Sequence, residues 1–307
     1  MIFKYKTVLI TGGTGSFGQA MTQYLLDNGA EKILIFSRDE FKQDVMCKKF
    51  NSDKLRFFIG DIRDKERLVR AMHGVDFVIH AAALKQVPAC EYNPIEAIKT
   101  NVNGAMNVID AAIDCKVQKV VALSTDKAVN PINLYGATKL CSDKLFVNAN
   151  AYSGKVGTMF SVVRYGNVAG SRGSVMPYFE DLIKHGELVL PVTDIRMTRF
   201  YITLDQGIEL VDTAFNKMQG GEIFIAKIPS FKITDYVEHL EKAFRVIGIR
   251  PGEKLHEIMI TAEDSERVRE FEKYYIIFAD DKIRKIGKAV EPGFTYSSDN
   301  NREWLFV

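Results

Sequence analysis

The sequence of 307 residues predicts an α/β protein built on a doubly wound parallel sheet, with a smaller lid in its C-terminal part. Two observations carry this prediction. Short apolar runs alternate with helical patterns six times within about the first 165 residues, which is typical of strands joined by crossover helices. The alternation stops after Gly170. We therefore expect one domain over residues 1–170 and a lid over residues 171–307, part of which returns to the main sheet.

The composition excludes several classes of protein. The 41 basic and 39 acidic residues give a net charge of +2, which does not favour binding to nucleic acid or to an acidic membrane surface. No apolar run approaches the roughly 18 residues that span a bilayer, and the first residues lack the apolar segment of a secretion signal. Without a Cys-x-x-Cys pair or a histidine cluster, the cysteines predict free thiols of a cytoplasmic protein and no metal site. They are Cys47, Cys90, Cys115 and Cys141.

The first apolar run, residues 7–10, predicts a buried parallel strand and leads into a segment rich in glycine. Gly12 permits a tight turn, Gly15 lets the backbone approach a pyrophosphate, and Gly18 lets the following helix pack closely on the strand. The spacing Gly-x-x-Gly-x-x-Gly differs by one residue from the usual dinucleotide-binding form. We expect a Rossmann-type cofactor site here rather than an ordinary glycine-rich turn. The residues between the glycines that belong to it are Thr14, Ser16 and Phe17.

The second apolar run, residues 33–36, ends where an NAD site would carry an acidic residue. This chain has Ser37 and Arg38 at that point, and Lys42 follows one helical turn later. A hydroxyl and two cations suit the 2′-phosphate of NADP better than the bare ribose of NAD. NAD stays open as an alternative because Asp39 follows at once, and Arg38 can equally be a solvated charge at a helix start.

The third strand is predicted over residues 56–59. Asp61 follows it, with Ile62 beside it, and either accepts a hydrogen bond from the adenine amino group or caps the next helix. A long helix from about residue 94 to residue 115 contains Asn101. Because asparagine is mildly unfavourable inside a helix, we expect Asn101 to join this helix to the active-site strand and to belong to the cofactor site.

The fourth strand, residues 76–79, ends in small residues. Ala81 and Ala82 let a cofactor lie against the backbone, and Lys85 follows where it suits the nicotinamide ribose. We interpret His80 as a packed histidine at the end of the strand rather than as a catalyst.

Residues 119–123 form the fifth predicted strand, and polar residues follow it at the carboxyl edge of the sheet, where open α/β sheets bind ligands. Tyr135 and Lys139 lie four residues apart and therefore share one face of a helix. This spacing is a weak signal alone, but the dinucleotide site upstream strengthens it. We expect a hydroxyl, a carboxylic acid, two ammonium groups and a phenol to converge on one crevice. The polar residues that follow the strand are Ser124, Thr125, Asp126 and Lys127.

The sixth strand is predicted over residues 161–165, and Asn167 and Val168 follow it at the same edge of the sheet. Beyond residue 170, three arginines stand on predicted turns beside the crevice, and the guanidinium fork suits a diphosphate. A surface ion pair is the alternative for each of them, but together they favour a nucleotide-linked substrate. The arginines are Arg172, Arg199 and Arg250. The other elements expected in this part are helices near residues 176–183 and 204–218 and strands near residues 223 and 247.

Together these motifs resemble the inverting UDP-N-acetylglucosamine 4,6-dehydratases of the pseudaminic-acid pathway, in the extended short-chain dehydrogenase/reductase superfamily. The resemblance covers nearly the whole chain, which ends somewhat earlier than the family implies. Lys127 stands where retaining relatives carry glutamate, and Tyr135, which some relatives in capsule synthesis lack, favours the flagellin-sugar branch. The motifs lie at residues 11–18, 37–40, 80–85, 123–127, 133–139, 164–168, 171–174, 197–200 and 248–254.

The resemblance implies an NADP-dependent lyase that converts UDP-N-acetylglucosamine, by internal hydride transfer, into UDP-2-acetamido-2,6-dideoxy-L-arabino-hexos-4-ulose. It implies Tyr135 as the base for the 4-hydroxyl with Lys139 beside it, Lys127 as the base at C5 and Asp126 as the acid at C6. It also implies a cytoplasmic homo-oligomer, with a hexamer as one form, that serves flagellin glycosylation. Substrate contacts are expected from Lys85, Thr125, Asn167, Arg172, Ser174, Arg199, Arg250 and Glu253.

These roles require shifted pKa values. Lys127 must be neutral to act as a base, and burial beside Lys139 and nicotinamide would lower its pKa from the usual value of about 10.4. Asp126 must be protonated, which requires an apolar setting that raises its pKa. Lys139 and oxidised nicotinamide would favour the phenolate of Tyr135. In the structural alternative, Asp126 caps the following turn and pairs with Lys127.

Two other functions are compatible with the sequence. A UDP-sugar 4-epimerase or a retaining 4,6-dehydratase needs the same scaffold, although an epimerase leaves Asp126 and Lys127 without a role. A protein of another class, a non-catalytic NADP sensor, needs the cofactor site alone. The sequence does not specify the base or the acyl group of the sugar nucleotide.

Overall fold

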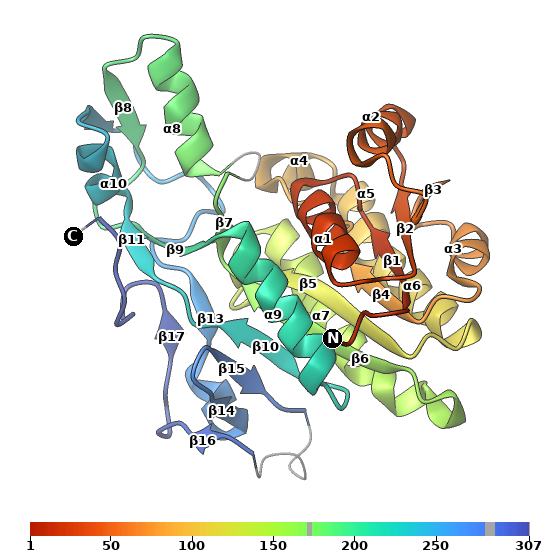
Figure 1. Cartoon of the computed structure of the whole chain (residues 1–307). Helices are drawn as coiled ribbons and strands as arrows, with labels where there is room; N and C mark the ends of the chain where they lie inside the picture. Colours follow the sequence, from red (N-terminus) through yellow and green to blue (C-terminus); the bar gives the residue numbers. More distant parts are fainter. Residues whose placement is uncertain (171–173, 280–285, 307) are drawn as a thin grey trace.

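A large sheet forms the centre of the protein, whose computed structural model describes residues 1–170, 174–279 and 286–306 (Figure 1). Six of its strands run parallel in the order β3-β2-β1-β4-β5-β6. The reversal of strand order on either side of β1 confirms the predicted doubly wound sheet. The strands are β1 (Thr7–Thr11), β2 (Lys32–Ser37), β3 (Leu55–Ile59), β4 (Phe77–His80), β5 (Lys119–Thr125) and β6 (Met159–Tyr165).

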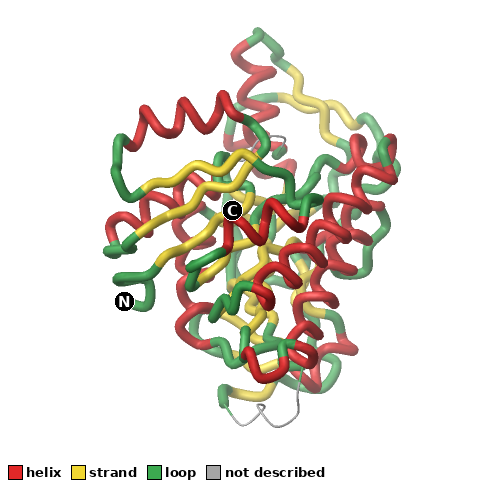
Figure 2. The backbone as a smooth tube through the Cα atoms, turned by 90° about the vertical axis from the view of Figure 1, so that its right-hand side faces the viewer, coloured by secondary structure: helices red, strands yellow, loops and turns green. Residues whose placement is uncertain are grey.

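Helices cover both faces of this sheet, as the view in Figure 2 shows. Alternate residues of β1 enter different cores: Val8 and Ile10 pack on one face, and Leu9 packs on the other. Burial of both faces explains why the first strands read as continuous apolar runs. The helices are α1 (Ser16–Asp27), α2 (Glu40–Phe50), α3 (Lys65–Met72), α6 (Gly104–Asp114), α7 (Leu134–Tyr152) and α9 (Leu204–Lys217).

The long helix expected from residue 94 to residue 115 is interrupted. Helix α5 (Pro94–Ile98) passes through a π-helical turn, Lys99–Asn103, before α6 begins, and α4 (Val87–Tyr92) precedes them. The wide turn contains Asn101, whose side chain is buried. A local π-turn of this kind often marks a functional position in a helix.

A separate small core lies in the region expected to form a lid, and the elements around it come from the chain from residue 174 together with the short strand at residues 167–168. A three-stranded sheet in the order β11-β9-β7 and a parallel pair, β8 and β12, lie beside helices α8 and α10. The expected helices near residues 176–183 and 204–218 are present as α8 and α9. The bounds are β7 (Asn167–Val168), α8 (Val175–Lys184), β8 (Val189–Val192), β9 (Thr198–Ile202), β11 (Ser230–Lys232), α10 (Ile233–His239) and β12 (Ala243–Val246).

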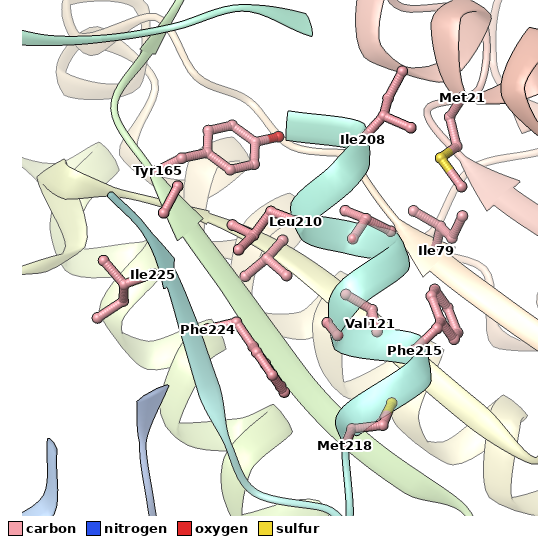
Figure 3. Packing of buried hydrophobic residues seen from close by; sticks show 14 of the residues in the cluster. Met21, Ile79, Val121, Tyr165, Ile208, Leu210, Phe215, Met218, Phe224 and Ile225 are labelled. Carbon is pink, nitrogen blue, oxygen red and sulfur yellow. The ribbon is translucent and has the colours of Figure 1, made fainter. Parts of the chain in front are cut away.

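Part of this C-terminal region returns to the main sheet. Strand β10 (Ile223–Ala226) lies parallel to β6, and β15 (Tyr274–Ile277), β14 (Val268–Glu270) and β16 (Lys288–Ala289) continue the edge in antiparallel pairs. Helix α9 packs across the sheet, with Leu210, Phe215 and Met218 in the core (Figure 3). A division of the chain at residue 170 stays a prediction.

The remaining short elements close the C-terminal end. Strand β13 (Ile258–Ile260) pairs with β17 (Tyr296–Ser297), and single 3₁₀ turns occupy Asp126–Ala128, Gly154–Val156 and Ala262–Arg267. Within the described residues, the four cysteines are free thiols and no helix is long and apolar enough to cross a bilayer.

Candidate active site

One cavity of about 1060 Å³ runs along the carboxyl edge of the sheet, from the glycine-rich turn after β1 to the lid. Its walls come from the ends of β2, β4, β5 and β6, from α7 and α8, and from the loop of residues 250–254. A cavity of this size at the topological switch point can hold a dinucleotide and a second ligand.

The glycine-rich turn has the geometry of an anion cradle. Gly12 has a φ of +68°, and a Cβ there would lie 2.9 Å from the Cα of Ala82. A Cβ on Gly18 would lie 2.4 Å from the carbonyl oxygen of Gly13, so only glycine lets α1 pack this closely. Gly15 is the N-cap of α1 and offers no side-chain acceptor, which leaves the first N–H groups of the helix to face the cavity. These residues fit a dinucleotide pyrophosphate.

The end of β2 carries the predicted ribose-phosphate contacts. Ser37, Arg38 and Lys42 all line the cavity, and the nearest carboxylate oxygen to Arg38, Oδ2 of Asp61, lies 3.8 Å from its Nη1. Asp39 is the N-cap of α2, and its Oδ1 accepts a hydrogen bond of 2.9 Å from the backbone N–H of Lys42. Asp39 is the acidic residue for which NAD was kept as an alternative cofactor, and its carboxylate therefore caps helix α2.

Asp61 does not cap a helix. Its Oδ1 accepts a hydrogen bond from the backbone N–H of Arg63, its Oδ2 accepts from the Arg63 guanidinium, and Asp64 is the N-cap of α3. The Arg63 guanidinium and backbone N–H hold the pKa of Asp61 below its usual value, although burial opposes them. Asp61 lines the cavity as an ionised acceptor. The other predicted cofactor residues that line the cavity are Thr14, Ser16, Phe17, Ile62, Ala81, Ala82, Lys85, Ser124 and Val168.

Asn101 does not line the cavity, and it does not reach the active-site strand. Its Oδ1 accepts from the backbone N–H of Leu84 at 2.8 Å, and its Nδ2 donates to the carbonyl oxygen of Leu84 at 2.8 Å and to Oγ1 of Thr138 at 3.0 Å. The side chain thus ties the segment after β4 to helix α7. The predicted bridge exists, but its partner is the helix that carries Tyr135 and Lys139.

His80 is a packed histidine, as interpreted from the sequence. Its Nδ1 lies 2.8 Å from Oγ1 of Thr11, and the ring is buried. Burial, with a smaller contribution from Lys139, lowers the pKa of His80 to about 3, so the ring is neutral near pH 7.

Helix α7 brings Tyr135 and Lys139 to the cavity wall on successive turns. Asn133 caps the helix by accepting from the N–H of Gly136 at 2.8 Å. A Cβ on Gly136 would lie 2.1 Å from the carbonyl oxygen of Lys127, so this glycine lets α7 pack directly on the Asp126–Ala128 turn. Nζ of Lys139 donates to the carbonyl oxygen of Leu123 at 2.7 Å.

The expected stabilisation of the Tyr135 phenolate by Lys139 and oxidised nicotinamide stays a prediction, and Lys139 alone does not produce it. Burial raises the pKa of Tyr135 to about 12, and the cation that opposes this shift is Lys127 rather than Lys139. Burial also lowers the pKa of Lys139 from its usual value. The phenol is therefore protonated at neutral pH unless a further positive charge enters the cavity.

Lys127 reaches the cavity, whereas Asp126 lies behind it. The Lys127 side chain is 23% exposed and the Asp126 side chain 1%. Nζ of Lys127 lies 3.2 Å from Oδ1 of Asp126, 3.3 Å from Oδ1 of Asn167 and 3.4 Å from Oε1 of Glu257. The 3₁₀ turn is capped by Thr125, whose Oγ1 accepts weakly from the N–H of Lys127 at 3.4 Å. The structural alternative had Asp126 cap this turn and pair with Lys127. The ion pair with Lys127 is present, but the cap is Thr125 and not Asp126.

The carboxyl group of Asp126 is in an unusual setting for an ionised acid. Its Oδ1 accepts from Oγ1 of Thr125 at 2.9 Å, and its Oδ2 accepts no hydrogen bond from the described residues. Burial raises the pKa of Asp126 and Glu257 adds to the shift, although Lys127 opposes it. This is the direction that the acid role requires.

The expected lowering of the Lys127 pKa is wrong. Burial does disfavour the ammonium, but the nearby carboxylates of Asp126 and Glu257 outweigh burial and raise the pKa of Lys127 above its usual value. No local pattern around Lys127 predicts this shift, because Glu257 lies on a distant part of the chain.

The lid contributes several of the predicted substrate residues. Arg199 is buried rather than part of a surface pair: its Nη1 donates to the carbonyl oxygens of Thr198 and Leu255, and its Nε lies 3.8 Å from Glu257. Arg172 lies outside the described residues. Ser174, Arg250 and Glu253 from the lid line the cavity, as do Thr125 and Asn167 from the preceding part of the chain.

Sequence reasoning missed Glu257 and two contacts that attach the loop of residues 250–254 to the site. Nδ2 of Asn133 donates to the carbonyl oxygen of Gly252 at 2.8 Å, and Nζ of Lys254 donates to the carbonyl oxygen of Val129 at 2.5 Å. In each contact the two residues are more than a hundred positions apart in the sequence, so no local pattern predicts it.

Comparison with known proteins gives a family and close relatives. The chain matches the polysaccharide biosynthesis protein family over residues 8–279. It is 57% identical to an inverting UDP-N-acetylglucosamine 4,6-dehydratase from Campylobacter jejuni (strain 81-176), over 99% of this chain and 95% of the relative. It is 46% identical to a UDP-glucose 4-epimerase from Rickettsia conorii, over 90% of this chain and 84% of that relative.

Two solved structures have the same architecture. Pen from Bacillus thuringiensis superimposes with a TM-score of 0.92 at 40% identity, over 100% of this chain and 96% of that chain. The dTDP-glucose 4,6-dehydratase DesIV from Streptomyces venezuelae, solved with NAD and TYD bound, superimposes with a TM-score of 0.73 at 23% identity, over 81% and 86% of the two chains. At that identity DesIV supports the fold alone.

Proposed function

We propose that this chain, which belongs to the polysaccharide biosynthesis protein family and to the group of inverting UDP-N-acetylglucosamine 4,6-dehydratases, removes water from UDP-N-acetylglucosamine across C5 and C6 and inverts C5. The product is UDP-2-acetamido-2,6-dideoxy-L-arabino-hexos-4-ulose, and the enzyme is a lyase. The observation that carries the proposal is the triad of Lys127, Asp126 and Tyr135 beside the cavity that begins at the glycine-rich turn.

The cofactor is NADP, held along the sheet edge. The turn from Gly12 to Gly18 and the open end of α1 receive the pyrophosphate. Arg38 and Lys42 receive the 2′-phosphate, and the capping role of Asp39 favours NADP over NAD because it engages the carboxylate that a ribose hydroxyl would need. When bound, oxidised NADP supplies a reversible hydride acceptor and a positive charge beside the phenol.

Tyr135 takes the proton of the 4-hydroxyl at its phenolic oxygen. Its pKa of about 12 in the protein alone makes it a poor base, and added positive charge in the cavity favours the phenolate. Lys139, fixed by the carbonyl oxygen of Leu123, lies one turn away and offers donors to the cofactor ribose. The resulting ketone at C4 acidifies the hydrogen at C5.

Asp126 and Lys127 share one proton during the elimination. At neutral pH Lys127 holds it, since the two carboxylates raise its pKa. Transfer of the proton over the 3.2 Å to Oδ1 of Asp126 gives a neutral amine and a neutral acid, without changing the net charge of the site. The amine takes the proton from C5, and the acid supplies a proton to the departing C6 hydroxyl. The pair then returns to its ionised state. The elimination leaves a double bond between C5 and C6, so the product requires that the hydride removed from C4 be returned to C6 and that C5 take up a proton from the opposite face, which inverts that carbon.

The proton of Asp126 needs a route, because this side chain does not line the cavity. Thr125 does line it, and its Oγ1 lies 2.9 Å from Oδ1 of Asp126. A hydroxyl can accept one proton and donate another. We therefore assign Thr125 the passage of the proton from Asp126 to the leaving hydroxyl.

One incubation tests this function. Purified protein is mixed with UDP-N-acetylglucosamine and NADP in deuterated water, and the product is identified by NMR. A 4-keto product with inverted C5 and deuterium at that carbon is expected. A 4-epimer would favour the activity named for the Rickettsia relative, and a C5-retained ketone would favour a retaining dehydratase. NADP binding without turnover of any UDP-sugar in a panel would leave a cofactor-sensing protein.

The cellular setting is also part of the proposal. The free thiols suit the reducing cytoplasm, and the product suits pseudaminic-acid synthesis for flagellin glycosylation. Exposed apolar side chains on α4 to α6 favour assembly into a homo-oligomer, and a hexamer is one of the forms we consider. Light scattering would measure the number of subunits. These side chains are Tyr92, Ile95, Ile98 and Met106.

A further inference from the structure

Glu257 is a buried acid to which the mechanism above assigns no step of its own. It precedes β13, and its side chain is 3% exposed. Its backbone is held on both sides by the C-terminal segment: its N–H donates to Oγ of Ser298 at 2.9 Å, and its carbonyl oxygen accepts from the N–H of Ser298 at 2.8 Å. Oγ of Ser298 also contacts Oγ1 of Thr198 on β9 at 2.6 Å. The carboxylate therefore stands on a fixed backbone.

Three cations face this carboxylate. Nζ of Lys127 lies 3.4 Å and Nε of Arg199 3.8 Å from Oε1, and Nζ of Lys254 lies 4.0 Å from Oε2. Arg199 and Lys254 already donate to backbone carbonyl oxygens. The other polar contacts of Lys127 Nζ are Asn167 at the cavity wall and Asp126 behind it. Oε2 accepts no hydrogen bond from the described residues. Lys127 is thus the one of the three cations with a proposed chemical step to perform.

Glu257 remains ionised in this setting. Burial disfavours its charge, but Lys127, Arg199 and Lys254 outweigh burial and lower the pKa of Glu257. Among the described residues, the charged and titratable groups that face Lys127 are Asp126, Glu257, Arg199, Tyr135 and Lys254, and the first two favour its ammonium form. A fixed negative charge at 3.4 Å stabilises any positive charge that appears on Nζ.

We propose that Glu257 is a positioning residue for the C5 step: it holds the amine of Lys127 at the cavity wall and stabilises the ammonium that forms when Lys127 takes the C5 proton. This inference rests on the proposed dehydratase function. It assigns to the lid a part in the chemistry as well as in substrate binding, because Glu257 comes from the C-terminal region and Lys127 from the end of β5.

A second consequence concerns the pH dependence. The reactive state of the Asp126–Lys127 pair carries one proton, so activity falls at low pH when the pair gains a second proton and at high pH when it loses the first. The Glu257 carboxylate favours proton binding by both members. Removing its charge moves both limbs of the profile to lower pH.

The test replaces the carboxylate with an amide of the same shape. Deuterium incorporation at C5 of UDP-N-acetylglucosamine is measured against pH for the wild-type protein and for Glu257→Gln, with NADP binding and thermal unfolding measured in parallel. We expect the limbs of Glu257→Gln to lie lower by about 1–3 pH units, the usual effect of one nearby opposite charge, with a reduced maximal rate. Glu257→Asp keeps the negative charge but places it farther from Lys127, so it should give a smaller shift of the limbs in the same direction.

A purely structural role would lower the rate without moving either limb, and unshifted limbs in the variants would overturn the inference. If Glu257→Gln does not fold, Glu257→Asp decides by the same criterion. Failure of the proposed function is distinct, because the wild-type protein would then produce no 4-keto sugar with inverted C5.

Discussion

Replacement of Lys127 by alanine is the sharpest test of the assigned chemistry. The variant keeps the glycine-rich turn and the cations at the end of β2, so NADP binding should be retained. A positioned proton-transfer group contributes about 10²–10⁴-fold to a reaction, and we expect deuterium incorporation at C5 to fall by that factor. This corresponds to about 3–5 kcal/mol of activation free energy.

The same variant should have a stability that depends on pH in a defined direction. Without Lys127, the buried carboxyl of Asp126 loses its nearest cation, so its pKa, already raised by burial, rises further. The folded variant then holds a proton that the unfolded chain releases above about pH 4, and the free energy of unfolding falls as pH rises towards the folded pKa. The slope approaches about 1.4 kcal/mol per pH unit wherever the folded variant holds this proton and the unfolded chain does not.

The assays are NMR of the C5 position in deuterated water and urea unfolding at pH 5 and pH 7. Lys48→Ala is a matched control, since Lys48 is an exposed lysine on α2 whose ion pair, within the part of the chain that the structure describes, is with Asp44. The control should match the wild-type protein in both assays. Undiminished deuterium exchange at C5 in Lys127→Ala would show that Lys127 is not the base. An equal loss of stability at pH 5 and pH 7 would refute the raised pKa of the buried Asp126 carboxyl in this variant.

Three further substitutions examine other parts of the site. Arg38→Ala should weaken NADP binding by about tenfold or more while changing NAD binding little, as measured by fluorescence titration with each cofactor. Thr125→Val should lower turnover by about 10²-fold and Thr125→Ser should restore it, because serine keeps the hydroxyl; equal loss in both would exclude the relay. Asn101→Ala removes three hydrogen bonds to Leu84 and Thr138, so chemical denaturation should show a loss of about 2–4 kcal/mol.

The fold was predictable where the information is local. The six apolar strands and the glycine-rich turn were predictable from short stretches of sequence. Strand burial requires a contiguous apolar run, and the close approach of α1 requires glycines at nearby positions. The role of Gly18 is an example, since only the absence of a side chain allows its contact with Gly13. The break in the helix at residues 99–103 was not predictable, because it follows from the tertiary contacts of Asn101.

The composition of the site was predictable, but its electrostatics were not. Tyr135, Lys139 and Lys127 line the cavity together because they flank one strand end. The pKa of Lys127 depends on Glu257, which stands 130 positions later and is placed at the site by tertiary contacts, among them the pairing of β13 with β17. Pair interactions across such separations leave no periodicity or motif in a single sequence.

The place of β10 in the sheet has a consequence for how the protein is made. During synthesis, β6 leaves the ribosome about 60 residues before the strand that will cover its open side, and it is apolar at Val162 and Val163. Nascent chains of this length therefore present a bare sheet edge, which invites pairing with other chains. A gene truncated near codon 170 should yield insoluble material rather than a free-standing nucleotide-binding module, so attempts to produce the halves separately call for co-expression.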